Sequence, residues 1–529
     1  YDSSIGEYVI NWTDGTTKYR NTTKDFINVS EAVEVDYEAT NTEVKSMPSD
    51  AITGNVIQLT KSEYTKVVNK LGVVTNTDIE DVTLEVAAGE EAELPKQVTG
   101  YYSDGSTAAL NVSWNEEELG NIDFNKPGTY EVSGTVSRKE YDNPFIEQKA
   151  DPWITKGSDG YYYFTASYPM YGSGDSNGYS KITLRRSETI EGLQNAEEVT
   201  IWDSKNSANI HRYIWAPEIH EINGKWYVYF TGSTSSNVWG IRPHVLECTG
   251  DNIMDASSWT ESGVFQTVEG DDFSFKDFSL DMTYFENNGI HYVIWAQKGT
   301  ASDLYMATIN PDEPWKLTSK PMLLTTPEYS WERINENVNE GPAVIKREGK
   351  VFVYFSAAAT GVEYCMGVLA ANADSDLMNP NSWVKTPYPI LTSDDVPGEY
   401  GPGHNSFTVD ENGNDVFVYH ARSQECYENK CEYSNQDPLY DPCRHSRVKN
   451  VHWAADGTPI LKMTNEQAVS EENENITAVI TVQGENETVE GAILHYDMTV
   501  ENGVVVDKAG NNNGEVKNLK DEDINNGTL

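Results

Sequence analysis

Five titratable side chains stand at the same point of a repeating pattern in the middle of the chain. Each lies 12 to 15 positions before the last aromatic residue of a dense aromatic run, and the five are Asp151, Glu218, Asp281, Glu340 and His404. Carboxyl groups that share one site can act as proton donor and proton acceptor, because burial and neighbouring acids push their pKa values apart. The pattern therefore indicates acid–base chemistry. The alternative is that these are ordinary turn residues at the starts of strands.

The aromatic runs themselves form a repeat. They cover residues 160–164, 224–230, 289–295, 349–355 and 413–419, and their last aromatic residues are 66, 65, 60 and 64 positions apart. Runs that are rich in β-forming residues and bounded by turn residues predict buried strands. Several strands per copy at this period predict a five-bladed β-propeller over residues 141–465, since no helical pattern of a TIM barrel lies between them.

A propeller would direct these side chains to one axis. The first strand of each blade lines the central channel, and the glycine turn leads into the second strand. Packing alone disfavours acids at such positions, because buried acids raise each other's pKa and destabilise the fold. Trp153 and Trp215 lie next to two of the acids, and the apolar face of a sugar can stack on indole. Two carboxyl groups are the minimum for glycoside hydrolysis, so the sequence predicts a carbohydrate site.

Residues 141–465 resemble glycoside hydrolase family 43, the five-bladed group that contains arabinanases, arabinofuranosidases and β-xylosidases. The resemblance rests on the motifs Ala150-Asp-Pro-Trp153, Trp215-Ala-Pro-Glu218, Ser279-Leu-Asp281 and Glu340-Gly-Pro342. It implies an inverting mechanism, with Asp151 as the general base that activates water and Glu340 as the general acid that protonates the departing oxygen. In this assignment Asp281 tunes the pKa of Glu340 and orients it.

The same resemblance implies further roles. Glu218 is similar to a structural acid near the substrate pocket; it is expected to help bind the substrate and not to be catalytic. Arg422 resembles a blade-5 arginine that reaches sugar hydroxyls, with a surface salt bridge as the alternative. Arg444 and Arg447 are expected to hold the blade closure. His404 resembles a histidine beside a bound calcium or sodium ion, with a neutral, hydrogen-bonded channel histidine as the alternative. No other cofactor is expected.

The stretches 151–167 and 182–187 look most like the α-L-arabinofuranosidase subfamilies. That likeness implies an exo-acting enzyme that removes terminal α-L-arabinofuranose from plant polysaccharide side chains, in arabinan or arabinoxylan. A β-xylosidase and an exo-acting galactanase or galactofuranosidase are the alternatives, because a few loop residues can switch between these sugars. A non-catalytic, glycan-binding propeller is the alternative of another class. The complete set of Asp151, Asp281 and Glu340 favours the enzyme.

The flanking regions predict smaller β modules, so the expected fold class is all-β, a five-bladed propeller with flanking β-sandwiches. Residues 1–76 are a β-rich segment without assignment. Residues 77–140 alternate short strands with turns and resemble a bacterial immunoglobulin-like module. Residues 466–490 are expected to form a linker or a few exposed strands. Residues 491–529 resemble the opening strands of a concanavalin-like, laminin-G-type sandwich, which we expect to be truncated.

Composition excludes other classes of protein. The 529 residues carry a formal net charge of −46, which repels nucleic acid and anionic lipid. No run of about 18 apolar residues could span a bilayer. A carbohydrate polymer or oligosaccharide is the expected partner, and the protein is expected to be a monomer, secreted or at the surface of a bacterial cell. The first residues contain no signal peptide, so we expect it to have been removed or the chain to be an internal fragment.

Three of the five cysteines, Cys426, Cys431 and Cys443, fall within 18 residues. Their gaps do not match the spacing of a zinc ribbon. The sequence favours one local disulfide, with free thiols as the alternative.

Overall fold

The computed structural model divides the protein into two compact units, Tyr1–Gly72 and Val73–Leu529. It describes residues 1–25, 28–36, 60–168, 178–234, 236–237, 239–428, 430–431, 443–484, 496–501, 504–507 and 514–515. Over these residues the structure consists mostly of β-strands, as predicted. None of the helices described is both long and apolar enough to cross a membrane.

The first unit contains a small antiparallel sheet and one helix. The sheet has the order β1 (Tyr8–Thr13), β2 (Lys18–Thr23), β3 (Val33–Glu34), and the helix is α1 (Lys61–Leu71). The helix was not predicted, although its N-terminus has a recognisable signal. The Thr60 hydroxyl accepts a hydrogen bond from the backbone N–H of Glu63, whose carboxylate accepts the backbone N–H of Thr60. This reciprocal capping box satisfies two backbone donors at the helix start.

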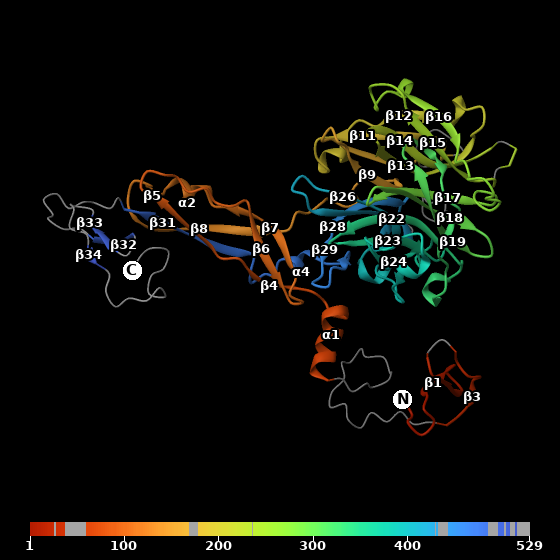
Figure 1. The fold of residues 1–529 in the computed structure, drawn as a ribbon, viewed down its shortest axis with the longest axis horizontal. Coiled ribbons are helices and arrows are strands. Elements are labelled where there is room, and N and C mark those ends of the chain that lie inside the picture. The colour runs from red at the N-terminus through yellow and green to blue at the C-terminus, as the bar shows by residue number, and fades with distance from the viewer. Residues whose placement is uncertain are drawn as a thin grey trace. The chain divides into compact units, whose positions relative to one another are not determined.

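Five antiparallel sheets form the blades of the propeller (Figure 1). Blade 1 contains β9 (Ala150–Lys156), β10 (Tyr162–Ser167), β11 (Lys181–Ser187) and β12 (Val199–Asp203). Blade 2 contains β13 (Arg212–Ile222), β14 (Lys225–Ser233), β15 (Arg242–Cys248) and β16 (Trp259–Val264). Blade 3 contains β17 (Ser279–Asn287), β18 (Ile290–Lys298), β19 (Ser302–Asn310), β20 (Glu313–Leu317) and β21 (Met322–Thr325). Blade 4 contains β22 (Asn339–Arg347), β23 (Lys350–Ala357), β24 (Cys365–Asn372) and β25 (Val384–Lys385). Blade 5 contains β26 (Glu399–Val409), β27 (Asp415–Ser423) and β28 (Arg444–Asn450), with the short helix α3 (Gln424–Tyr427) after β27.

The aromatic runs form the second strand of each blade, β10, β14, β18, β23 and β27. Their side chains are buried because each sheet packs against its neighbours on both faces. The first strands β9, β13, β17, β22 and β26 contact one another in turn, and β26 contacts β9, which closes the ring. The predicted repeat therefore corresponds to the blades.

The chain closes the ring by adding its own earlier segment to blade 5. The backbone N–H of Phe145 donates to the carbonyl of Ser446 at 2.8 Å, and the N–H of Ser446 donates to the carbonyl of Ile146 at 3.1 Å. These bonds pair the segment before β9 with β28, so the first and last blades are held together.

The immunoglobulin-like module is one curled sheet with the order β4-β6-β7-β8-β31-β5. Its strands are β4 (Asn76–Ile79), β5 (Val82–Ala87), β6 (Gln97–Tyr102), β7 (Thr107–Trp114), β8 (Gly128–Ser137) and β31 (Asn475–Gln483), and α2 (Glu116–Gly120) follows β7. Ile79 and Val82, from strands at opposite ends of this order, pack in the same core with Leu110. The sheet therefore bends until its two ends meet.

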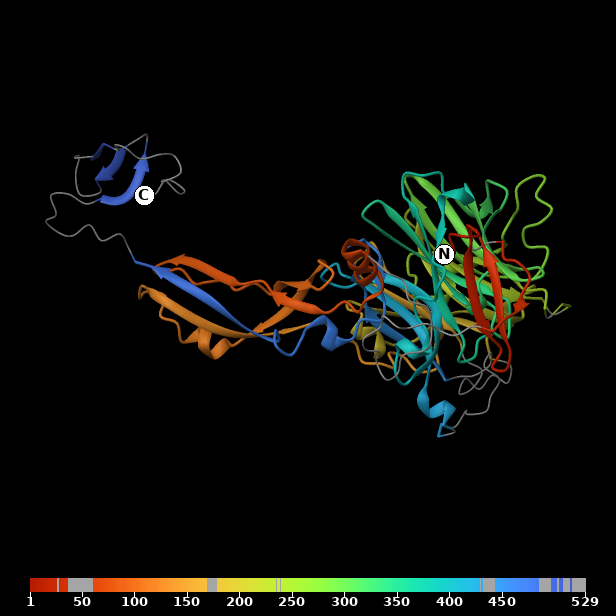
Figure 2. The ribbon, with the colours of Figure 1, turned by 90° about the horizontal axis from the view of Figure 1, so that it is seen from below.

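Strand β31 corrects the prediction that residues 466–490 form a linker. It lies between β8, to which it is antiparallel, and β5, to which it is parallel (Figure 2). Ala478, Ile480 and Val482 are buried at alternate positions, the period of a strand that packs on one face. The module is thus completed by residues that follow the propeller in the sequence.

Short elements follow the propeller. They are β29 (His452–Trp453), β30 (Pro459–Ile460), α4 (Asn465–Ala468) and a sheet of β32 (Tyr496–Glu501), β33 (Val504–Asp507) and β34 (Gly514–Glu515). Strands β32 and β33 lie within residues 491–529, the segment that resembles the start of a laminin-G-like module. The other residues after 484 lie outside the described part of the chain.

Candidate active site

A local distortion recurs in the first strand of every blade. Each contains a residue with a positive φ, and these residues are Asp151 (φ 55°), Ala216 (43°), Asp281 (53°), Gly341 (54°) and His404 (43°). The register between the first and second strands shifts in all five blades. A bulge of this kind breaks the alternation of side chains and re-aims one of them. Left-handed residues other than glycine are strained, and strain of this kind gathers at functional sites.

Neighbouring blades hold these strained residues in place. At four of the five junctions, a side chain on the second strand of one blade accepts the backbone N–H of the left-handed residue on the next blade. The pairs are Ala216 N to Ser167 Oγ (2.8 Å), Asp281 N to Thr231 Oγ1 (3.3 Å), His404 N to Ser356 Oγ (2.7 Å) and Asp151 N to His420 Nδ1 (3.0 Å). These bonds satisfy buried donors, so the ring fixes the direction of each side chain.

Three of the left-handed residues, Asp151, Asp281 and His404, line a cavity of about 680 Å³. Asp151, Asp281, Glu340 and His404 all line it, as the sequence analysis expected of residues on one axis. Trp215 lines it as well, and the remaining wall includes Trp239, Phe278, Tyr364 and Arg444. The cavity thus combines buried acids with aromatic surface, which is the composition of a sugar site.

Asp151 is held in its ionised form. Its carboxylate accepts a hydrogen bond from the Ser167 hydroxyl at 2.5 Å, and Arg444 Nη1 lies 3.5 Å from its Oδ1. Burial opposes ionisation, but the neighbouring His404 and Arg444 outweigh it and hold the pKa of Asp151 well below its usual range. Arg444 supplies a permanent positive charge, whereas burial lowers the pKa of His404.

Glu340, unlike Asp151, is favoured in its protonated form. Burial raises its pKa to about 7, and the charge of Asp151 acts in the same direction. The hydroxyl of Tyr364 donates to Glu340 Oε1 at 2.9 Å and opposes this rise. The Tyr364 ring lies parallel to the His420 ring, with centroids 5.8 Å apart. Gly403 makes room for it, since a Cβ there would stand 2.4 Å from the tyrosine ring.

Asp281 is another buried acid of the cavity, and its pKa is also raised. Burial raises its pKa, and so do the charges of Glu340 and Asp151. The repulsion is mutual, so an ionised Asp281 also disfavours ionisation of Glu340. Asp281 Oδ2 accepts the backbone N–H of Gly341 at 3.0 Å. This bond positions the backbone next to Glu340, as an orienting residue would.

Two of the predicted sugar-binding residues lie elsewhere. Trp153 does not line the cavity; its indole N–H donates to the carbonyl of Ile219 at 3.0 Å, and its ring packs edge-on against His220. The left-handed Asp151 breaks the alternation along β9, so Trp153 turns into the core between blades 1 and 2. Glu218 is buried beside the same histidine, with Oε2 2.9 Å from His220 Nε2, and burial raises its pKa. It is a core residue, not a cavity residue.

The prediction for the blade-5 arginine also needs correction. Arg422 is buried, not on the surface, and it does not line the cavity. Its cross-strand partner Arg444 does line the cavity and contacts Asp151. Arg447 contacts Glu399 at 3.3 Å and donates to the Ser423 hydroxyl at 3.1 Å, and both partners lie within blade 5.

His404 does not gather a set of metal ligands. Its Nδ1 lies 3.3 Å from Asp151 Oδ1 and 3.9 Å from Asp281 Oδ2, while the guanidinium of Arg444 already neutralises Asp151. Among the described residues, only the blade-5 cysteines place three possible metal-ligand atoms of His, Cys, Asp or Glu within 4.8 Å of one another. The ion expected at His404 therefore rests on the family resemblance alone.

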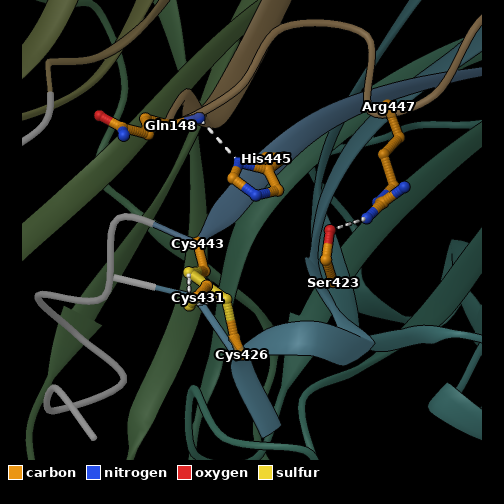
Figure 3. Close-up of a disulfide and its surroundings, with 7 residues drawn as sticks. All are labelled: Gln148, Ser423, Cys426, Cys431, Cys443, His445 and Arg447. Carbon is orange, nitrogen blue, oxygen red and sulfur yellow. Dashed lines mark hydrogen bonds between the residues drawn. A yellow bond between two sulfur atoms is a disulfide. The ribbon is translucent and has the colours of Figure 1, made fainter. Parts of the chain in front are cut away.

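The cysteine group contains the favoured local disulfide, which joins Cys426 to Cys443 (Figure 3). Cys431 is the third member, with its sulfur 2.9 Å and 3.0 Å from the other two. Figure 3 also shows His445, whose Nδ1 accepts the backbone N–H of Gln148 at 2.8 Å. Cys443 of the disulfide directly precedes Arg444, the arginine that contacts Asp151.

Sequence reasoning missed Tyr364, His420 and the position of Arg444. A weak signal existed for His420. It directly follows the last aromatic residue of the fifth run, as Thr231 and Ser356 follow those of the second and fourth runs. Aligning the repeats there would have marked a polar position that faces the next blade. Tyr364 lies outside the aromatic runs, and no spacing in the sequence marks it.

Two parts of the chain match known protein families. Residues 141–459 match the family described as glycosyl hydrolases family 43, and residues 79–139 match the bacterial Ig-like domain, group 4. An extracellular exo-α-(1→5)-L-arabinofuranosidase of Streptomyces avermitilis is 44% identical over 324 residues, which are 60% of this chain and 62% of that protein. One of the same name from Streptomyces chartreusis is 42% identical over 287 residues, 53% of this chain and 82% of that protein.

A solved structure is also similar. The crystal structure of an α-L-arabinofuranosidase from Lactobacillus brevis is 41% identical, with a TM-score of 0.54 over 61% of this chain and 96% of that one. The present chain spans 62% of the length of the curated Streptomyces avermitilis relative.

Proposed function

The chain belongs to glycosyl hydrolase family 43, and we propose that it is an exo-acting, inverting α-L-arabinofuranosidase. Its substrate would be terminal α-L-arabinofuranose on plant polysaccharides such as arabinan or arabinoxylan. One observation carries the proposal: a single cavity holds an acid that stays ionised, Asp151, and an acid with a pKa of about 7, Glu340. Glycoside hydrolysis needs one carboxylate and one carboxylic acid at the same pH.

In the proposed reaction, Asp151 removes a proton from a water molecule while the water oxygen attacks the anomeric carbon. The bond between that carbon and the glycosidic oxygen breaks, and the departing oxygen takes the proton of Glu340. Arg444 keeps Asp151 ionised, and Asp281 holds the backbone N–H of Gly341 next to Glu340. Direct displacement inverts the configuration at the anomeric carbon.

The names of the similar proteins support arabinofuranose as the sugar. The test is a screen of the purified protein with 4-nitrophenyl α-L-arabinofuranoside, β-D-xyloside and β-D-galactofuranoside, followed by α-1,5-arabino-oligosaccharides. We expect release from the arabinoside and stepwise release of arabinose alone from the oligosaccharides. Proton NMR of the first product should show the β-anomer. Preferential release of xylose or galactofuranose would contradict the proposed sugar, and binding without any hydrolysis would favour a glycan-binding propeller.

The pH dependence follows from the same two acids. Glu340 must be protonated, so activity should fall as the pH rises through about 7, while Asp151 stays ionised throughout this range. The hydrogen bond from Tyr364 lowers the pKa of Glu340. Tyr364→Phe should therefore raise that pKa and move the alkaline limb of kcat/KM upward, by roughly 0.5 to 1 pH unit for one hydrogen bond.

The matched control is Tyr354→Phe. Tyr354 is also a fully buried tyrosine, and its hydroxyl has no hydrogen-bond partner among the described residues. Its profile should coincide with that of the wild type. An unchanged limb in Tyr364→Phe, or the same shift in both variants, would contradict the role of the Tyr364 hydroxyl.

The wider setting is part of the proposal. The relatives named as extracellular support a secreted protein, and a carbohydrate polymer as partner follows from the proposed reaction. We also propose a monomer without a required cofactor. A calcium or sodium ion at His404 would add positive charge on the axis, and no step described above depends on it.

A further inference from the structure

Aromatic side chains form a continuous series from the catalytic acids to the mouth of the cavity. Trp215 meets Tyr179 edge-on with centroids 6.0 Å apart, and the Tyr179 hydroxyl lies 3.4 Å from the guanidinium of Arg444 at Asp151. On its other side, Trp215 packs against Tyr213 at 4.6 Å.

The series ends at Trp239. Its ring stacks on Tyr213, with centroids 5.1 Å apart and an angle of 24° between the planes. Trp215 is 7% exposed, whereas Trp239 is 55% exposed. Both tryptophans line the same cavity, so the series leads from a buried floor to an open rim.

The backbone is strained at Tyr213, in the middle of this aromatic series. Tyr213 has a φ of 55°, and the register of β13 shifts on both sides of Trp215. A bulky residue in the left-handed region costs about 1–3 kcal/mol unless the surroundings compensate for it. The strained Tyr213 supports the back of the Trp239 ring. Single exposed aromatic residues are ordinary on a protein surface. Trp239 differs because it stacks on the strained Tyr213 at the mouth of a cavity, so its apolar ring plane is held facing outward.

We propose that the exposed face of Trp239 binds the second sugar of the substrate, the neutral arabinofuranose that becomes the leaving group. This inference rests on the proposed function. The terminal sugar must reach Asp151 and Glu340 in the buried part of the cavity, so the rest of the chain leaves through the mouth. An indole plane there matches the apolar C–H face of a furanose ring. Glu336 and Glu363 also line the cavity, and their charge disfavours an anionic substrate but not a neutral sugar.

The position of Trp239 predicts a preference for arabinan chains over small glycosides. The test compares α-1,5-arabinotriose, which has a second sugar, with methyl α-L-arabinofuranoside, which has none. Trp239→Ala should lower kcat/KM for arabinotriose about tenfold, mostly through KM, the loss expected for one or two methylene-sized contacts. It should change kcat/KM for the methyl glycoside less than twofold. Trp239→Phe, which keeps an aromatic face, should recover most of the loss.

A second measurement tests substrate binding alone, in a variant that lacks the proton donor for hydrolysis. In a Glu340→Gln background, Trp239→Ala should weaken the Kd for arabinotriose about tenfold, as measured by calorimetry. The control is Phe273→Ala, which removes another exposed aromatic ring that lies outside the cavity lining. It should leave both substrates unaffected.

The outcomes separate this inference from the proposed function. Equal losses on the two substrates would place Trp239 at the terminal sugar and overturn the inference. An unchanged rate and Kd for arabinotriose would overturn it as well. A wild-type protein that releases arabinose from neither substrate would contradict the proposed function and this inference with it.

Discussion

Glu340→Gln should lower turnover of α-1,5-arabino-oligosaccharides by at least about 100-fold. The amide has nearly the shape of the protonated acid but cannot give a proton to the departing oxygen. A sugar alkoxide is a poor leaving group without that proton. The loss on 4-nitrophenyl α-L-arabinofuranoside should be much smaller, because nitrophenolate leaves without protonation. The pair of substrates therefore reports on the proton donor itself, and the measurement is kcat for each.

The control for this variant is Glu218→Gln. Glu218 is a buried acid on the first strand of blade 2, burial keeps its pKa raised, and it does not line the cavity. Since its neutral form is already similar to an amide, we expect less than a tenfold change on either substrate. Equal losses on the two substrates in Glu340→Gln, or wild-type turnover of oligosaccharides, would refute the assignment of the acid.

The sequence carried enough information to predict the ring of blades and its acids. Residues that repeat with the blade period occupy similar places, so the sequence predicted that five polar side chains before five aromatic strands face one axis. The exception is Glu218, which lies two residues after the left-handed Ala216 and is buried in the core. Asp151, Asp281, Glu340 and His404 do line one cavity. This prediction needed only the repeat and the topology, not the details of any loop.

Predictions that depended on the exact face of a strand were less successful. Alternation along β9 places Trp153 on the same side as Asp151, but the left-handed Asp151 breaks that alternation. Arg422 and Arg444 are directly opposite each other on β27 and β28. Nothing in the order of residues says which of the two reaches the acids. Packing between blades determines where a strand bulges and which side chain contacts the acids. This packing cannot be deduced from a single sequence.

Contacts between segments that are distant in the chain could not be predicted from the sequence either. Strand β31 follows the propeller but completes a sheet that begins before it. Its alternating apolar residues were readable as a strand, yet its partners lie more than 300 positions earlier in the chain. Composition therefore favoured a linker where the fold has a central strand.

Asp151→Asn should cause the larger loss, roughly 1,000-fold in kcat. The amide can still accept the hydrogen bond from Ser167, but it cannot take a proton from water. Water must attack whatever the leaving group is, so arabino-oligosaccharides and 4-nitrophenyl α-L-arabinofuranoside should lose activity by the same factor. This equality distinguishes the base from the acid, whose replacement should affect the two substrates unequally.

Removal of the Asp151 charge also leaves the buried Arg444 without its counter-ion, and an unpaired buried charge destabilises a fold. The Tm must therefore be measured beside kcat, together with the Kd for arabinotriose. Asp271→Asn is the matched control, because Asp271 is a buried aspartate that accepts backbone N–H groups outside the cavity. A folded Asp151→Asn protein that binds arabinotriose normally but does not hydrolyse it would establish Asp151 as the base. If that variant kept more than about a tenth of wild-type kcat, water activation would have to be assigned to another group at the cavity, and Asp281 is the other buried carboxylate that lines it.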